Sequence, residues 1–249
     1  MRALSALALV EAWDGPVAET AHARLDRVLR MVVDDEDIAN DTLGRRNQRL
    51  IALRRHLCGP RPIEAVARCG CGADNEVSIP ADAIEAAPVP APGTRITVEV
   101  GGRTVNARPP NMADLAAIAG LADADIACAA LLARCTDASN DGGGDDDDSI
   151  TDPDAVLTAL AARFYAMDPA ADVRLAIHCV GCGTPLSVVI DFAAFVSRDI
   201  GQHVMRLLSE IDCLARAYGW TETAILALPP ARRQRYVAMV RGEPVGGIG

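Results

Sequence analysis

Apolar residues recur at helical spacing in the first part of the chain. Between residues 21 and 32 they share one face, which comprises Ala21, Leu25, Val28, Leu29 and Val32. The pattern resumes before Gly59 and Pro60, with Leu50, Leu53 and Leu57 on one side and arginines on the other. The Gly-Pro pair predicts the end of this helix. We therefore expect residues 1–57 to be mainly helical.

Alternating apolar and polar residues, which are typical of strands, replace this pattern in three places. Two predicted hairpins have glycine-rich turns, and their strands span residues 63–68, 76–79, 172–179 and 186–191. A third hairpin is predicted at 95–108, with Gly101 and Gly102 at its turn.

Helical signals return between and after these hairpins. Asn111 can cap a helix at 112–121, and further helices are predicted at 123–135, from Pro153 to about 167, and at about 193–217. The last of these has apolar residues at helical spacing: Ile200, Val204, Leu207, Leu208, Ile211, Ala215 and Tyr218. Thr221 can cap a short helix, and Pro230 can open a final one with an apolar stripe of Tyr236, Met239 and Val240.

Charge narrows the possible partners. The net charge is −10, and all 24 basic residues are arginine. A surface that is basic throughout, as nucleic-acid binding requires, is therefore not expected. No apolar run approaches the roughly 20 residues of a membrane span, and "ALSALALV" near the N-terminus indicates an amphipathic helix rather than a signal peptide. We expect a cytoplasmic protein whose eight cysteines are reduced.

Two cysteine pairs carry the clearest chemistry. Cys69 and Cys71 lie in the turn of the first hairpin, and Cys179 and Cys182 lie in that of the last. The second cysteine of each pair precedes a glycine, which permits the turn of a zinc knuckle. Four thiolates from two knuckles would form a closed, structural zinc site. At an offset of 111 residues the two regions also share the order strand, knuckle, strand, helix.

These patterns predict an α+β fold, mainly helical, with two zinc-ribbon-like β-hairpins brought together and a C-terminal helical hairpin. We expect three segments. Residues 1–85 contain the N-terminal helices and the first knuckle, 94–168 a hairpin and a helical insert, and 169–243 the second knuckle and the last helices. A proline-rich linker covers 86–93, and an aspartate-rich stretch predicts a disordered loop at 137–151.

Other readings of the cysteines stay open. The C-x-C pair has a narrow bite, so His178 or Cys58 could replace one of its ligands, or the hairpins could survive without metal. Cys179 and Cys182 could instead form a redox pair, although a strand follows them where a thioredoxin-like site has a helix. Three further cysteines lie in predicted helices and are expected to be small core residues: Cys128, Cys135 and Cys213.

No catalytic pattern stands out. The histidines show no paired spacing, and the chain has neither a G-x-S-x-G nucleophile motif nor a glycine-rich phosphate loop after a strand. We expect a protein that is not an enzyme. The basic final helix, with Arg232 and Arg233, is compatible with a helix-turn-helix. The acidic composition instead favours a helical hairpin whose arginines contact an acidic partner or the protein's own acidic surface.

Several segments together resemble a known family. They are "LGRRNQRLIALRRHLCGPRPIEAVARCGCG" at 43–72, "HCVGCGTPLSVVIDFAAFV" at 178–196 and "LLSEIDCLARAYGWTETAILALPPARRQRYVAMV" at 207–240. The chain resembles the baseplate hub assembly proteins of contractile-tailed phages and of phage-tail-like contractile injection systems. It departs from the family's C-P-x-C-G pattern at the first knuckle, which is Cys69-Gly70-Cys71-Gly72.

The resemblance implies a non-enzymatic factor that builds the baseplate and binds baseplate or hub proteins, with no small-molecule substrate, membrane or nucleic acid. The hypothesised partner surface comprises Tyr218, Trp220, Arg232, Arg233 and Tyr236. The competing functions are a zinc-ribbon nucleic-acid-binding or regulatory protein, and a thiol redox enzyme.

Overall fold

The structure is a computed structural model that describes residues 2–15, 19–33, 38–137 and 153–244. Residues fall into two compact units, each made of separated segments. The first, here the helical unit, comprises residues 1–36, 52–61 and 191–249, and the second, the hairpin unit, comprises 37–51 and 62–190. Within the described ranges, no helix has the length and apolarity needed to cross a bilayer.

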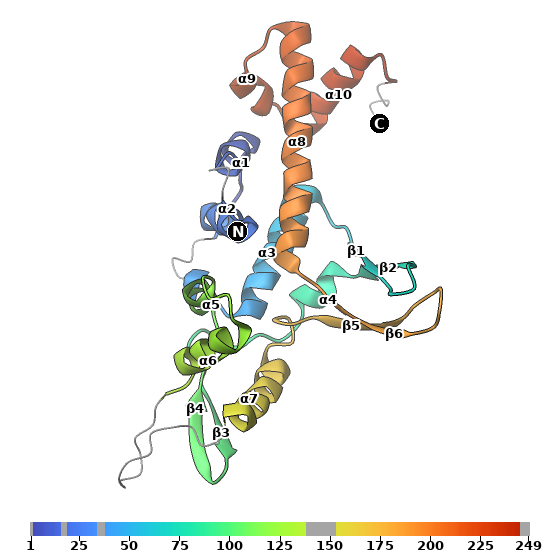
Figure 1. The fold of residues 1–249 in the computed structure, drawn as a ribbon. Coiled ribbons are helices and arrows are strands. Elements are labelled where there is room, and N and C mark those ends of the chain that lie inside the picture. The colour runs from blue at the N-terminus through green and yellow to red at the C-terminus, as the bar shows by residue number, and fades with distance from the viewer. Residues whose placement is uncertain (1, 16–18, 34–37, 138–152, 245–249) are drawn as a thin grey trace. The chain divides into compact units, whose positions relative to one another are not determined.

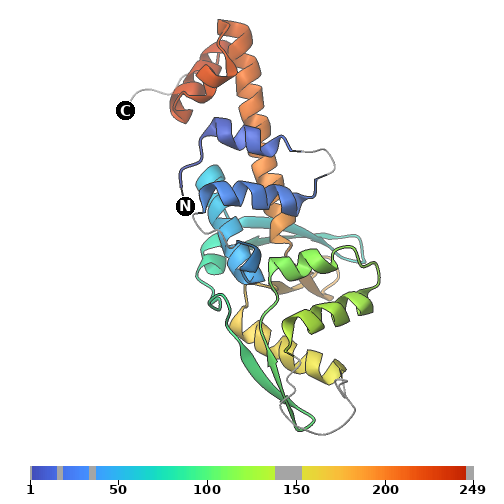
Figure 2. The same cartoon turned by 90° about the vertical axis from the view of Figure 1, so that its left-hand side faces the viewer.

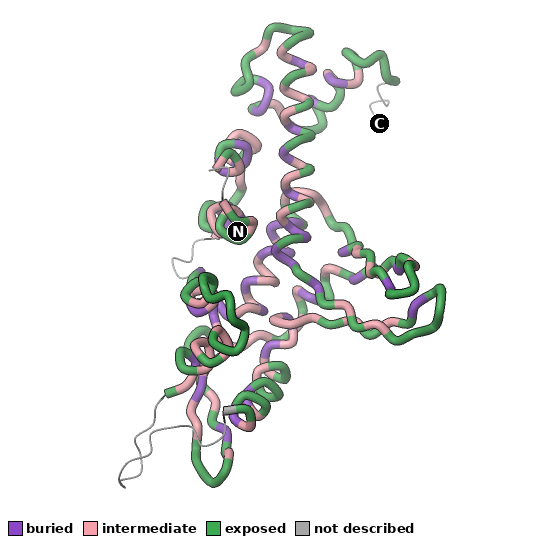
Figure 3. The backbone as a smooth tube through the Cα atoms, in the orientation of Figure 1, coloured by how far each residue is buried: buried purple, intermediate pink, exposed green. Residues whose placement is uncertain are grey.

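The helical unit is arranged along its longest helix, α8 (Phe192–Tyr218). Helices α1 (Ala6–Trp13) and α2 (Ala21–Val32) contact α8, as do α9 (Glu222–Leu226) and α10 (Pro230–Arg241), which fold back beside its C-terminal end (Figure 1, Figure 2). The C-terminal part of α3 (Leu43–Cys58) belongs to the same unit. Buried positions recur along α8 at helical spacing (Figure 3): Phe192, Ala193, Phe195, Val196, Ile200, Val204, Leu207 and Leu214.

Side chains fix where these helices begin and end. The Asp191 carboxylate accepts from the Ala194 N–H at the start of α8, and the Thr221 hydroxyl accepts from Ala224 N–H at the start of α9. Gly219 ends α8 with a φ of 69°, a left-handed conformation that glycine adopts without strain. The predicted cap at Thr221 and the predicted helices of this region are confirmed.

One prediction about α3 is wrong. Its arginines were expected on the side opposite Leu50, Leu53 and Leu57, but Arg54 is buried, with an exposed fraction of only 3%. The Arg54 guanidinium donates to the Asp199 carboxylate at 2.7 Å and stacks on the Phe195 ring at 4.9 Å. A buried guanidinium needs such partners, which an apolar pattern along one helix does not reveal.

The hairpin unit contains three separate two-stranded antiparallel sheets. They are β1 (Ile63–Arg68) with β2 (Asp74–Ile79), β3 (Ile96–Val100) with β4 (Arg103–Ala107), and β5 (Arg174–His178) with β6 (Pro185–Val189). The helical elements of the unit are η1 (Ile38–Asn40), the N-terminal part of α3, α4 (Ala81–Glu85), α5 (Met112–Ile118), α6 (Ala124–Cys135) and α7 (Pro153–Met167).

The middle hairpin shows how local sequence sets local structure. Gly101 and Gly102 have φ values of 60° and 77°, as a two-residue turn of this kind requires. The hairpin packs against α7 around a small core of Val98, Ala107, Val156 and Leu160. Asn111 caps α5 through a reciprocal pair of hydrogen bonds with Asp114, although α5 ends at Ile118, three residues before the predicted limit.

The α+β fold class is confirmed. The units nevertheless cut across the three predicted segments, because β1–β2 and β5–β6 belong to one unit although they are far apart in the sequence. The predicted order of strand, knuckle, strand and helix recurs as β1, β2, α4 and as β5, β6, α8. Most of the predicted acidic loop at 137–151 lies outside the described residues.

Candidate metal centre

The first knuckle connects β1 to β2. The Cys69 N–H donates to the Ala73 carbonyl, and the Gly72 N–H donates back to the Cys69 carbonyl, both at 2.9 Å. Gly72 has a φ of 90°, which strains any residue with a Cβ. The turn therefore closes within five residues, and both cysteines project from one end of the hairpin.

The second knuckle connects β5 to β6 with one residue more between its cysteines. The Cys179 N–H donates to the Thr184 carbonyl at 2.9 Å, and the Gly183 N–H donates to the Cys179 carbonyl at 2.8 Å. Gly183 has a φ of 73°. The Gly181 N–H also approaches Cys179 Sγ, at 3.4 Å, so the longer loop directs a backbone dipole at the buried sulfur.

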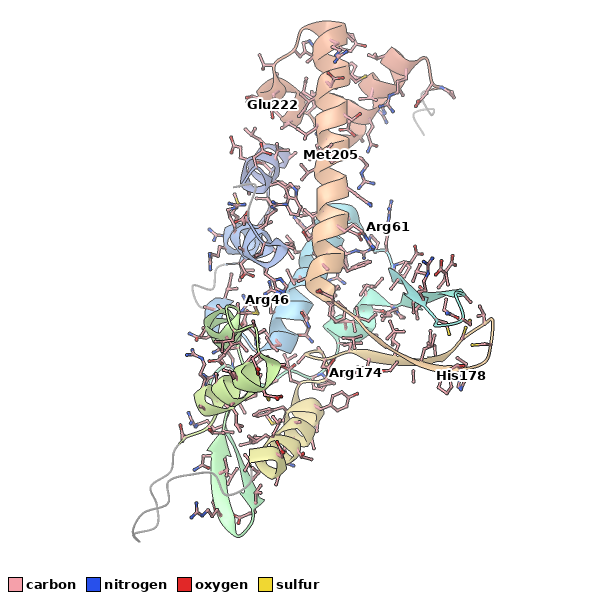
Figure 4. The ribbon with its side chains drawn as sticks, viewed as in Figure 1. Arg46, Arg61, Arg174, His178, Met205 and Glu222 are labelled. Carbon is pink, nitrogen blue, oxygen red and sulfur yellow. The ribbon has the colours of Figure 1, made fainter. Side chains whose placement is uncertain are left out.

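The four predicted ligands come together. Their sulfur atoms all lie within 4.8 Å of one another, and Figure 4 shows the sulfurs at the tips of the two hairpins. Cys69 Sγ lies 3.7 Å from Cys182 Sγ, and Cys71 Sγ lies 3.6 Å from Cys179 Sγ. A tetrahedral ion with metal–sulfur bonds of about 2.3 Å requires ligand separations of about 3.8 Å, so these four sulfurs could bind one metal ion.

The same distances argue against other arrangements of these thiols. Bonded sulfurs would be about 2.05 Å apart, and the four cysteines are free thiols. The alternative ligands do not join the group found among the described residues. His178 is exposed on β5, and the Cys58 thiol approaches the Asp199 carbonyl at 3.8 Å in the helical unit.

The electrostatic environment of the second knuckle favours the thiolate form of its cysteines. Burial raises the pKa of the Cys179 thiol. Hydrogen bonds from the backbone N–H groups of Cys182 and Gly181, together with those from the Cys69 and Cys71 thiols, outweigh burial and lower this pKa to about 6. Contacts with the Thr184 side chain and backbone lower the pKa of Cys182. Because metals bind thiolates, both effects favour the ligand form of these cysteines.

In the first knuckle, the pKa of the buried thiol of Cys69 is raised instead. The Cys71 backbone N–H favours the thiolate of Cys69, but hydrogen bonds with the neighbouring thiols and burial raise its pKa to about 12. Of four sulfurs this close together, only some can carry negative charge without a cation. Metal binding would therefore release at least the Cys69 proton.

Asn75 connects the two knuckles, and sequence reasoning missed it. It is only 3% exposed. Its Oδ1 accepts from the Val180 N–H in the second knuckle at 2.8 Å, while its Nδ2 donates to the Ala67 and Ala73 carbonyls of the first hairpin at 3.0 and 3.2 Å. The signal was its position, since Asn75 stands on the inward face of β2 in alternation with Val77 and Ile79.

The loops also approach each other closely. A Cβ at Gly181 would lie 2.9 Å from the Ala73 Cβ and 3.5 Å from Cys71 Sγ. A side chain there would push the hairpin tips apart. Gly181, whose φ is ordinary, is thus needed for the contact between the hairpins rather than for its own turn.

The predicted partner-binding residues lie in the helical unit. Tyr218 stacks on Trp220 with ring centroids 4.8 Å apart, and the Tyr236 ring stands edge-on to Trp220 at 5.1 Å. Arg232 is exposed. Arg233 differs from expectation, since it is 3% exposed and forms an ion pair with Glu210, so it stabilises the α8–α10 contact and offers no charge to a partner.

The apolar stripe predicted for α10 faces the core only in part. Tyr236 packs against Leu214, Ile225 and the buried Val237, but Met239 and Val240 are exposed. Arg233 and Val237, four residues apart, lie together on the buried side of the helix.

No protein-family model, curated protein or solved structure matches this chain. The chemistry must therefore be argued from the site itself. Two buried and two exposed thiols on two hairpins form a group that could bind a metal ion with four sulfur ligands.

Proposed function

We propose that Cys69, Cys71, Cys179 and Cys182 bind one zinc ion, and that the protein is a non-enzymatic assembly factor for the baseplate of a contractile phage tail or a related injection system. What supports the zinc is the convergence of two knuckles, far apart in sequence, on a cluster with nearly tetrahedral spacing. Four thiolates are a common ligand set for structural zinc.

The ion would have a structural task. Isolated two-stranded hairpins are only marginally stable in water, and β1–β2 and β5–β6 pair with no other strand among the described residues. A zinc ion bound by two cysteines from each hairpin would join them covalently through metal–sulfur bonds. Because all four positions of a tetrahedral ion would be filled, a substrate would find no open coordination site.

The baseplate role rests on the resemblance of residues 43–72, 178–196 and 207–240 to the hub assembly family. The three segments contain different parts of the fold. The first two supply the knuckles, and the third supplies the end of α8 with α9 and α10. We expect the knuckles to stabilise the protein and the helical end to contact other baseplate proteins.

Metal analysis and co-purification test this proposal together. The protein purified without chelators should contain one zinc per chain, and a Cys71→Ser/Cys182→Ser variant should contain none. Co-expression with the sheath, tube and spike proteins of a contractile tail should yield a complex. Zinc-free wild-type protein would refute the metal site, and salt-sensitive retention on DNA without any such complex would favour the nucleic-acid-binding alternative.

A further inference from the structure

Helix α10 presents an unusual concentration of exposed positive charge. It contains Arg232, Arg233, Arg235 and Arg241 and no acidic residue. Arg233 is paired with Glu210, but Arg232, Arg235 and Arg241 are exposed and form no ion pair with another described residue. Most arginines elsewhere in the described chain have hydrogen-bond or ion-pair partners. Contacts within the folded chain therefore do not account for the three exposed arginines of α10.

Aromatic and apolar side chains adjoin these arginines. Tyr218 is 42% exposed and Met239 is 54% exposed. The ring centroids of Tyr236 and Tyr218 lie 6.0 Å apart. Arg232, Arg235, Tyr236 and Met239 are spaced three or four residues apart along one side of α10, so they form one continuous strip. We call the set of Tyr218, Arg232, Arg235, Tyr236 and Met239 the α10 surface.

The composition of the α10 surface is typical of protein interfaces. Arginine, tyrosine and methionine are enriched there, because each combines a large apolar area with a polar group or an adaptable shape. The rings of Trp220 and Tyr236 pack on the core residues Leu214, Ile225 and Val237, which fixes the base of this surface. A rigid base reduces the entropy lost on binding.

The charge of the surroundings indicates what would bind. The segments of the helical unit contain 14 arginines and 13 acidic residues, whereas those of the hairpin unit contain 10 and 21. The positive charge of α10 is therefore a local feature of a chain whose net charge is −10. An acidic protein segment would match it without bringing the extended phosphate backbone of DNA close to an acidic chain.

We propose that the α10 surface docks an acidic, partly apolar helix of another protein. The proposal deepens the assembly role and rests on it for the identity of the partner, but the recognition chemistry stands on the described side chains alone. Carboxylates of the partner would pair with Arg232 and Arg235, and its apolar residues would cover Met239 and the Tyr218 ring.

A direct binding measurement tests the proposal with the full-length, zinc-loaded protein. The probe is a synthetic amphipathic helix of glutamate and leucine, and its counterpart with glutamine in place of glutamate is the matched control peptide. We expect the acidic peptide to bind and to weaken as salt rises. Arg232→Glu/Arg235→Glu should reduce its affinity by at least about tenfold, and Met239→Ser should reduce it by a few-fold.

A matched protein variant separates local recognition from net charge. Arg30→Glu changes an exposed arginine on α2 of the same unit and should leave binding unchanged. Equal binding of both peptides, an equal loss in Arg30→Glu, or tighter binding of duplex DNA than of the acidic peptide would overturn the proposal. So would self-association that Arg232→Glu/Arg235→Glu abolishes, because a second copy would then be the occupant. Zinc content is measured separately, so failure of the metal site and failure of the α10 surface are distinguishable.

Discussion

The two knuckles each contribute two cysteines to the candidate metal centre, on loops that differ by one residue. Cys179 receives hydrogen bonds from two backbone N–H groups, those of Gly181 and Cys182, whereas Cys69 receives one, from Cys71. The pKa of Cys179 is accordingly lowered to about 6, and that of Cys69 is raised to about 12. The neighbouring thiols add to this difference, because their hydrogen bonds lower the pKa of Cys179 and raise that of Cys69.

The comparison implies unequal roles for the two hairpins. The second knuckle is prepared to bind a cation, because its buried thiol ionises readily. In the first knuckle, the raised pKa of Cys69 means that this thiol would ionise only when the cation binds. The short C-x-C turn can still supply two of the four sulfurs. The sulfurs of Cys69 and Cys71 lie close to those of Cys182 and Cys179 of the other hairpin, so the turn does not have to bring its own two sulfurs close together.

The largest effect should come from removing a buried ligand. Cys179→Ser replaces the thiolate that the backbone prepares, so we expect metal affinity to fall by at least about a hundredfold, measured by competition with a chelator. Cys213→Ser changes a half-buried thiol of the helical unit and serves as the control. Wild-type affinity in Cys179→Ser would mean that the four sulfurs do not share one ion.

A smaller loss is expected when the connection between the knuckles is removed. Asn75→Ala deletes the hydrogen bond that joins the two knuckles and two hydrogen bonds within the first hairpin, but it removes no ligand. Supporting residues of this kind typically contribute 10- to 100-fold to metal affinity. Asn47→Ala is the matched control, because the Asn47 amide donates to the Ala170 carbonyl at 2.8 Å in the same unit, away from the cysteines. If both variants lower metal affinity equally, Asn75 acts only through general stability.

The sequence was sufficient for features set by local patterns. The three hairpins, the glycines of their turns and the caps at Asn111 and Thr221 depend on a few neighbouring residues, and each type of turn or cap demands particular side chains. The cysteine group was also predictable in part, because knuckles have a recognisable glycine after the second ligand. The spacing did not show that residues so far apart would meet, and only the pairing of two similar motifs indicated it.

Features that depend on tertiary partners were not predictable. The charges of Arg54 and Arg233 suggested solvent, but Asp199 and Glu210 make their burial possible. A pattern along one helix contains no information about a carboxylate contributed by another, so the predicted face of α3 was wrong and that of α10 was correct only in part. Asn75 was missed for the same reason, because its side chain accepts a hydrogen bond from a backbone N–H on the other hairpin.

Proton binding offers a further test of the knuckle comparison. In the metal-free protein the lowered pKa of Cys179 should produce a step in ultraviolet thiolate absorbance near pH 6. Cys179→Ser should abolish this step. Cys69→Ser should retain it at a somewhat higher pH, because the Cys69 thiol is one of the hydrogen-bond donors that favour the Cys179 thiolate.

The sign of the accompanying stability change follows from the same two pKa values. A lowered pKa means that Cys179 stabilises the metal-free fold above the ordinary thiol pKa of about 8.5, and that this contribution is lost as pH falls through about 6. For Cys69 the raised pKa gives stability below about 8.5 that is lost as pH rises toward about 12. Urea midpoints that fall on the acid side equally in wild type and Cys179→Ser would contradict this assignment.

The smallest effects should come from the turn glycines, where the two knuckles are alike. Gly72 and Gly183 have φ values of 90° and 73° with no atom near enough to obstruct a Cβ, so an alanine would introduce backbone strain alone. Each substitution should cost about 1–2 kcal/mol in urea unfolding of the metal-free protein. Gly70→Ala is the control within the same loop, since it has open space and no positive φ, and should be nearly neutral. A much larger loss at Gly183 than at Gly72 would show that the second loop is the more constrained of the two, and that its low thiol pKa is maintained by a strained backbone.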